Sequence, residues 1–113
     1  MKKDLLTLLD LQPDQVKKLL ERAVVLKKER QKGKSSKILA NKTLAMVFEK
    51  PSTRTRASFD VAMYELGGHS IYIESATSQL GRGETYFDTG RVLSRYAHGV
   101  VVRTFSQSTL EEF

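Results

Sequence analysis

Apolar residues in the first part of the chain recur at the spacing of an α-helix. Between Pro13 and about Arg30 the apolar positions are Val16, Leu19, Leu20, Ala23 and Val24. Residues at this spacing gather on one face of a helix. Proline suits a first helical position, because the amide that it lacks would have no intrahelical partner there. The polar stretch from Gln31 to Lys37, which contains Gly33, should end the helix and form a loop.

Short apolar runs farther along the chain predict three β-strands. These runs are Thr43–Phe48, His69–Ile73 and Gly99–Arg103. The first and third are dominated by apolar residues, which is typical of strands buried on both faces of a sheet. The stretch from Glu74 to Glu84 contains Gly81 and Gly83 and predicts a long loop.

Helical spacing returns between the predicted strands. From Thr53 to Leu66 one helical face would carry the apolar residues Phe59, Ala62, Met63 and Leu66. The glycines that follow, Gly67 and Gly68, supply a left-handed stop. A further helix is predicted from about Thr85 to Ala97, and Gly90 inside it should weaken that helix by roughly 1 kcal/mol relative to alanine.

The end of the chain carries a helix-start signal. Ser108 and Glu111 have the spacing of a capping box, which predicts a helix that begins after Ser108. Barely one turn could follow before Phe113, and so short a helix does not persist without packing. This favours a truncated chain, part of a longer protein.

Strands that alternate with helices predict an α/β fold. Right-handed crossovers would place the strands in a parallel sheet with helices on both faces. No repeat or low-complexity segment marks a second domain, so residues 1–113 are expected to form part of one domain.

Composition narrows the class of protein. Hydrophobic residues make up 40% of the 113 residues and charged residues 28%, which is ordinary for a globular chain. The sequence has no apolar run of about 18 residues and no signal-peptide core, so we expect a soluble cytoplasmic protein without a membrane partner. Because cysteine is absent, disulfides and thiol chemistry are excluded within these residues.

The net charge of +6 raises the question of nucleic-acid binding. Many of the lysines lie between Lys17 and Lys42, at the end of the predicted helix and in its loop, without interleaved aromatic residues for stacking. This distribution favours a solvated face over a nucleic-acid interface.

An anion site is indicated directly after the first predicted strand. In the run from Phe48 to Arg56, Ser52 would cap the helix and leave free amides at its start, where the helix dipole also favours negative charge. Arg54 could add a guanidinium fork, and the hydroxyls of Ser52 and Thr55 could donate hydrogen bonds. In the plainer interpretation Ser52 is only a cap and the arginines are solvated or paired. Arg56 is expected to pair with Asp60 one turn later.

The residues Lys50-Pro51-Ser52-Thr53-Arg54-Thr55-Arg56-Ala57-Ser58-Phe59, set between a buried strand and a helix, resemble the signature of the aspartate and ornithine carbamoyltransferases. The resemblance spans nearly the whole chain. Two segments, Ser78 to Glu84 and Val102 to Phe105, look like the ornithine branch. The resemblance implies that the chain is a truncated carbamoyl-phosphate-binding domain, without the ornithine-binding domain.

The resemblance also implies site residues. Ser52, Thr53 through its backbone, Arg54 and Thr55 would hold the phosphate of carbamoyl phosphate, and Gln79 would reach the phosphate bound by a neighbouring subunit of a trimer. Arg103 would contact both phosphate and the carbonyl oxygen, so Arg103 and Thr55 are the expected catalytic residues. No cofactor or metal is expected.

The implied reaction is transfer of the carbamoyl group to the δ-amine of ornithine, giving citrulline and phosphate in arginine biosynthesis or related amino-acid metabolism. The family's later His-Pro-x-Gln motif is absent from these residues, so the chain alone is expected to be inactive. Alternatives are a carbamoyltransferase for aspartate or another amine, a non-catalytic binding or assembly module, and a basic nucleic-acid-binding domain.

Overall fold

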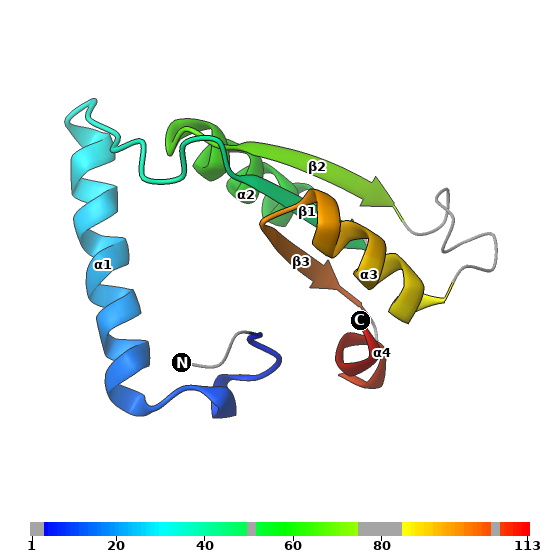
Figure 1. Ribbon diagram of the computed structural model, residues 1–113. Coiled ribbons are helices and arrows are strands. Elements are labelled where there is room, and N and C mark those ends of the chain that lie inside the picture. The colour runs from blue at the N-terminus through cyan, green and yellow to red at the C-terminus, as the bar shows by residue number, and fades with distance from the viewer. Residues whose placement is uncertain (1–3, 50–51, 75–84, 105–106) are drawn as a thin grey trace. The chain divides into compact units, whose positions relative to one another are not determined.

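A computed structural model describes residues 4–49, 52–74, 85–104 and 107–113 (Figure 1). The chain divides into two compact units, Met1–Ser35 and Ser36–Phe113. Within the described ranges, no helix has the length and apolarity that a membrane span requires.

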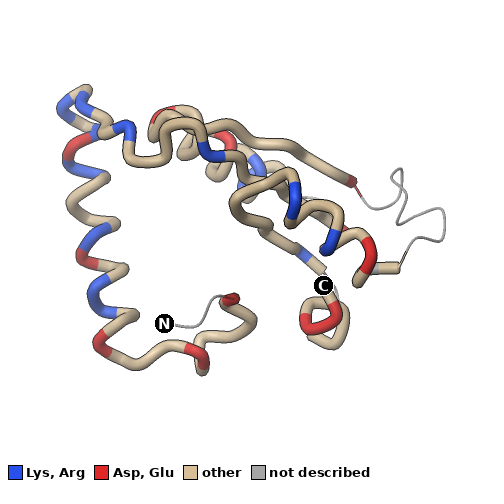
Figure 2. The backbone as a smooth tube through the Cα atoms, viewed as in Figure 1, with Lys and Arg blue, Asp and Glu red and all other residues tan. Residues whose placement is uncertain are grey.

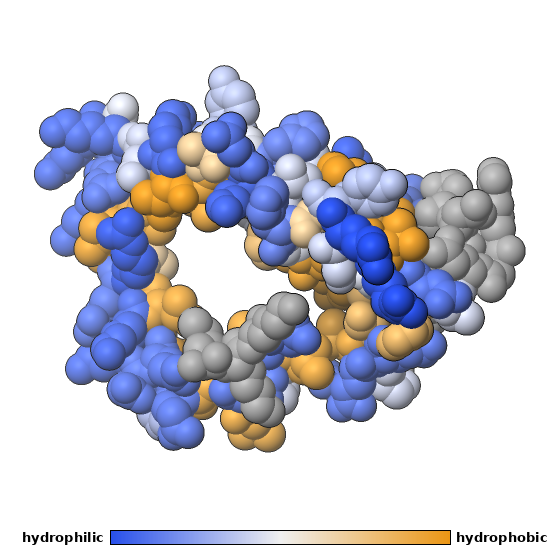
Figure 3. All heavy atoms as spheres, in the orientation of Figure 1, coloured by the Kyte–Doolittle hydropathy of each residue, from blue (hydrophilic) through white to orange (hydrophobic). Residues whose placement is uncertain are grey.

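The first unit consists of a short 3-10 helix, η1 (Leu8–Asp10), and the helix α1 (Pro13–Gln31). The prediction of an amphipathic helix that begins at Pro13 is confirmed. Lysine and arginine alternate with acidic residues along α1 (Figure 2), so its charge is mixed. Apolar side chains gather along one side of the helix (Figure 3) and remain exposed, among them Leu19, Leu20, Val24 and Val25.

The second unit is built on a parallel sheet of three strands, β1 (Thr43–Phe48), β2 (His69–Glu74) and β3 (Gly99–Arg103), in the order β2-β1-β3. The helix α2 (Thr53–Glu65) joins β1 to β2, and α3 (Tyr86–Tyr96) lies between β2 and β3 in the chain. Figure 1 shows these two helices on opposite faces of the sheet, with α3 in front. The predicted α/β fold, with a parallel sheet covered on both faces, is confirmed.

The core of the sheet lies in its central strand. Ala45, Met46, Val47 and Phe48 of β1 are at most 2% exposed, as expected for a strand with a partner on each side. The prediction that β3 is equally buried is wrong, because all five of its residues are only half-buried. Within the described ranges β3 is an edge strand that pairs with β1 alone.

The capping box predicted near the end of the chain is also wrong. The helix α4 (Gln107–Glu112) begins before Ser108, so Ser108 is the second residue of the helix instead of its cap. The long loop predicted from Glu74 to Glu84 lies outside the described residues apart from Glu74, which ends β2.

The C-terminal end of α2 has the geometry that the glycine pair predicts. The amide of Gly68 donates to the carbonyl of Met63 at 2.7 Å and that of Gly67 to Tyr64 at 3.1 Å, the two bonds of a Schellman motif. Gly67 has a φ of +92°, and a β-carbon on it would lie 3.2 Å from Cβ of Lys37. The turn therefore needs glycine for conformation and for space.

Gly90 has a packing role in addition to the expected effect on the helix. A β-carbon at this position of α3 would lie 2.6 Å from the carbonyl oxygen of Phe113. The glycine therefore permits close approach of the backbone that follows α4, in addition to any loss of helix propensity.

Replacing Gly67 with alanine should lower the free energy of unfolding by about 1–2 kcal/mol, because a side chain is strained at positive φ and crowded here. Gly99→Ala is the control. Its β-carbon would meet Leu44 at an ordinary 3.4 Å, so its stability should change little. Urea unfolding followed by circular dichroism measures both, and equal stabilities would contradict the assignment.

Candidate anion site at the carboxyl ends of the first and third strands

The order in which strands are added to the sheet reverses its direction at β1. From β1 the chain proceeds to β2 on one side, and it later returns to β3 on the other side. Segments that follow β1 and β3 therefore leave the sheet toward opposite faces, and parallel α/β sheets bind their ligands in the crevice that opens there. Both predicted anion-binding segments lie at this edge, Ser52–Arg54 after β1 and Arg103 at the end of β3.

Ser52 caps α2, as the sequence predicts. Its backbone is extended, and its Oγ accepts the amide of Thr55 at 3.3 Å. Helix geometry gives the preceding amides, those of Thr53 and Arg54, no intrahelical acceptor. These two donors and the positive end of the helix dipole remain at the start of α2.

Arg103 reaches the first turn of α2 from the neighbouring strand. Its Nη1 donates to Oγ1 of Thr55 at 3.1 Å, and Thr55 Oγ1 also accepts the hydroxyl of Ser52 at 3.0 Å. A chain of hydrogen bonds thus joins three of the predicted site residues, although Thr55 and Arg103 are 48 positions apart.

The guanidinium of Arg103 is incompletely satisfied. Its Nε atom is buried and has no hydrogen-bond acceptor, and among the described residues no carboxylate pairs with the group. A buried donor without an acceptor is uncommon in proteins, and a buried cation without a counter-charge is costly. This arrangement fits a group whose counter-ion is a bound ligand.

Arg54 and Thr53 occupy the same helix start but are exposed. The Arg54 side chain has no protein partner within the described ranges. By contrast, Ser52, Thr55 and Arg103 are half-buried and linked. Gln79, the remaining predicted site residue, lies outside the described residues.

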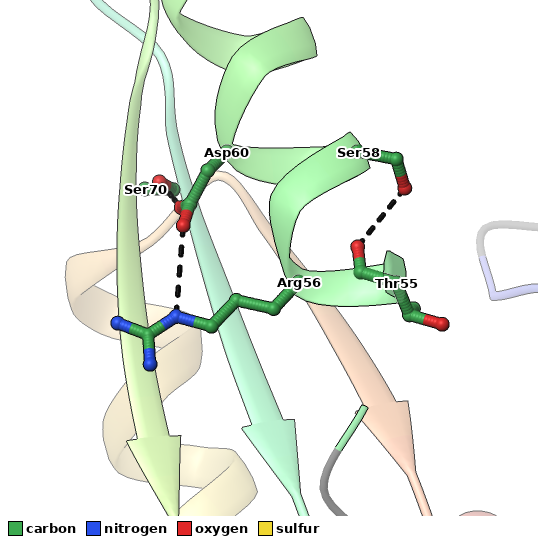
Figure 4. A network of polar contacts seen from close by, with 5 residues as sticks. All are labelled: Thr55, Arg56, Ser58, Asp60 and Ser70. Atoms are coloured by element: carbon green, nitrogen blue, oxygen red, sulfur yellow. Dashed lines mark hydrogen bonds and ion pairs between the residues drawn. The ribbon is translucent and has the colours of Figure 1, made fainter. Parts of the chain in front are cut away.

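Arg56 has a different environment from Arg54, although only one residue separates them. Its Nε lies 3.6 Å from Oδ2 of Asp60, so the predicted pair is confirmed, and the other oxygen of Asp60 accepts the hydroxyl of Ser70 (Figure 4). The guanidinium carbon also lies 3.8 Å from the centroid of the Tyr72 ring. Arg56 therefore ties α2 to β2 instead of facing the anion site.

Two residues that the sequence did not single out lie at the same edge of the sheet. Thr104 donates its hydroxyl to Oε1 of Glu49 at 2.9 Å, and the Glu49 amide donates to the carbonyl of Arg103 at 2.8 Å. The only sequence signal for them is their place immediately after β1 and β3.

The two histidines lie at the amino ends of β2 and β3, apart from this site. His98 stands before β3, and its Nδ1 accepts the amide of Thr43 at 3.0 Å. Its own amide donates to the carbonyl of Thr43 at 2.8 Å. His98 therefore ties the opposite, amino ends of β1 and β3 together. In the part of the chain that the structure describes, no cluster of three or more acidic or histidine side chains could hold a metal.

The arrangement suits a tetrahedral oxyanion. Main-chain amides, two hydroxyls and two guanidinium groups differ in reach and geometry, and together they offer more donors than a single carboxylate could accept. Arginine forks match phosphate oxygens in two-point contacts, whereas amides at a helix start provide fixed partial charge.

Comparison with known proteins agrees with this geometry. Residues 3–113 match the family model described as aspartate/ornithine carbamoyltransferase, carbamoyl-P binding domain. An ornithine carbamoyltransferase of Methanocorpusculum labreanum is 52% identical over 113 residues, which are all of this chain and 37% of that protein.

Solved structures agree as well. Ornithine carbamoyltransferase from Pyrococcus furiosus superposes with a TM-score of 0.89 at 47% identity, covering 96% of this chain and 35% of that one. The catalytic subunit of M. jannaschii aspartate transcarbamoylase gives a TM-score of 0.82 at 37% identity, covering 93% of this chain and 35% of that one. The chain thus belongs to the aspartate/ornithine carbamoyltransferase family and corresponds to its carbamoyl-phosphate-binding domain.

Proposed function

We propose that this chain binds the phosphate group of carbamoyl phosphate at the carboxyl ends of β1 and β3. The observation that carries the proposal is the half-buried Arg103, whose buried Nε has no acceptor and whose Nη1 donates to the hydroxyl of Thr55. Ser52, Arg54 and Thr55, with the amides of Thr53 and Arg54, supply the remaining donors. Gln79 is assigned to the phosphate bound by a neighbouring subunit of a trimer.

We infer further that the whole protein transfers the carbamoyl group to ornithine. The relatives that are about half identical to this chain carry the name ornithine carbamoyltransferase, which supports ornithine over aspartate as the second substrate. A role in arginine metabolism and a cytoplasmic location belong to the same proposal.

The site would assist the reaction by fixed charge. The neutral δ-amine attacks the carbamoyl carbon, a C–N bond forms, the bond from that carbon to the phosphate oxygen breaks, and the proton of the amine passes to the departing phosphate. Arg103 and Thr55 face the developing negative charge on the carbonyl oxygen, and the start of α2 with Arg54 holds the departing phosphate. Preorganised donors stabilise such charges better than water, which must reorient around them. No covalent intermediate with the protein is required.

A second candidate function is that of a binding or assembly module without turnover. The chain spans 37% of the length of the curated relative from Methanocorpusculum labreanum. The two candidates share the anion site and differ in whether these residues alone catalyse.

Phosphate binding is testable with a matched pair of arginine variants. Arg54→Gln should weaken binding of carbamoyl phosphate at least about tenfold, because hydrogen bonds to a charged group are lost. Arg56→Gln removes the same charge from the same helix, but its side chain is held by Asp60 and Tyr72, so binding should change less than about threefold. Amide chemical shifts during a titration provide both dissociation constants, and equal responses of the two variants would refute the assignment.

Turnover is expected to need more than this chain. The purified 113 residues should form no citrulline above the uncatalysed rate, because orientation of both substrates contributes much of the rate enhancement in a two-substrate reaction. A colorimetric citrulline assay measures this, with a full-length ornithine carbamoyltransferase as the positive control. Turnover by the chain alone would show that the catalytic site is misplaced.

Assembly and ligand binding should be linked if Gln79 acts between subunits. Carbamoyl phosphate should then raise the trimer fraction in sedimentation velocity, because a ligand that contacts two subunits stabilises their association. Gln79→Ala should reduce that rise while leaving the distribution without ligand unchanged. A spread of sizes indifferent to ligand would instead indicate nonspecific association, and the role of Gln79 would be abandoned.

A further inference from the structure

The ends of β1 and β3 are joined by a side-chain bond one step beyond their last backbone pair. The register of the two strands closes at Phe48 opposite Arg103. Immediately after this pair, Thr104 Oγ1 donates to Glu49 Oε1 at 2.9 Å, while the Glu49 amide donates to the Arg103 carbonyl at 2.8 Å. The two contacts extend the connection between the strands into the segments that diverge.

A different pair connects the same edge to α2. Arg103 directs its guanidinium to Thr55 in the first turn of α2, whereas Thr104, the next residue, turns to Glu49. Successive residues of an extended chain point to opposite faces, and these contacts follow that alternation. Arg103 therefore reaches the anion site from a backbone that is held at its other face by the Thr104–Glu49 bond.

The position of that backbone matters because the site has two halves. The start of α2 follows β1, and the guanidinium of Arg103 belongs to β3, so a change in the spacing of the strand ends moves one set of donors relative to the other. Displacements of about 1 Å are sufficient to weaken preorganised electrostatic sites substantially.

We propose that Glu49 and Thr104 are a positioning pair for the anion site, holding Arg103 at its working distance from the start of α2. The proposal rests on the function proposed above. Neither side chain is assigned a contact with the ligand. Glu49 contributes through its hydrogen-bond acceptor and not through its charge. A negative charge near an anion site opposes anion binding.

The acceptor role separates two classes of variant. Glu49→Gln keeps an oxygen acceptor for Thr104 and removes the charge, so phosphate should bind as tightly as to the native chain or more tightly. Glu49→Ala removes the same charge together with the acceptor, so its binding should be weaker than that of Glu49→Gln. Thr104→Val removes the donor at nearly constant volume and should weaken binding roughly three- to tenfold, and Thr104→Ser should restore it.

Inorganic phosphate is the probe, titrated into the 113-residue chain while amide shifts and the Arg103 Nε–H resonance are followed by NMR. The Arg103 resonance should move in Thr104→Val even without phosphate and should stay in place in Thr104→Ser. Combining Thr104→Val with Glu49→Ala should weaken binding by less than the sum of the two separate effects, as expected for two residues that share a bond.

Ser70→Ala is the matched control, because it removes another hydroxyl-to-carboxylate bond, that between Ser70 and Asp60. It should leave phosphate affinity unchanged. If Ser70→Ala weakens binding as much as Thr104→Val, general loosening of the fold explains both and the positioning role is overturned. It is also overturned if Thr104→Val binds phosphate like the native chain.

Failure of the proposed function has a different signature. If the native chain shows no response to phosphate, or if Arg103→Gln responds as the native chain does, the anion site itself is misassigned and the positioning role is rejected with it. If Arg103→Gln abolishes the response and Thr104→Val leaves it intact, only the positioning pair is rejected.

Discussion

The structure of the second unit depends on the burial of one strand between two parallel neighbours. Four consecutive residues of β1, Ala45 to Phe48, are at most 2% exposed, and apolar burial of this kind is the main stabilising contribution that so small a unit has. Because β2 and β3 take opposite sides of β1, α2 and α3 cover opposite faces, and the segments after β1 and β3 diverge. The meeting of Ser52, Thr55 and Arg103 at one edge of the sheet therefore follows from the strand order.

Arg56 and Arg103 carry the same side chain in two different electrostatic environments. Arg56 has an acidic neighbour, Asp60, and an aromatic face, Tyr72, so its charge is compensated within the protein. Arg103 has neither among the described residues, and its buried Nε lacks an acceptor. A buried donor without an acceptor is unfavourable in the protein by itself, which is why Arg103 carries the proposal of an anion ligand.

Local signals predicted most of the elements and part of the site. The cap at Ser52, the stop at Gly67 and the Arg56–Asp60 pair all depend on residues within a few positions of one another, and each is present. The burial of β3 was overestimated because it depends on neighbouring strands and not on composition. Arg103 was selected through family resemblance, and the bond between Thr104 and Glu49 was missed. These residues are 55 positions apart, and only the sheet register brings them together.

The close contact at Gly90 couples this position of α3 to Phe113, far along the chain. A β-carbon there and the present place of the Phe113 carbonyl oxygen exclude each other, because they would be 2.6 Å apart. Any residue larger than glycine at position 90 would require Phe113 to move away from α3. The packing of α3 beside the residue that follows α4 therefore depends on a missing side chain.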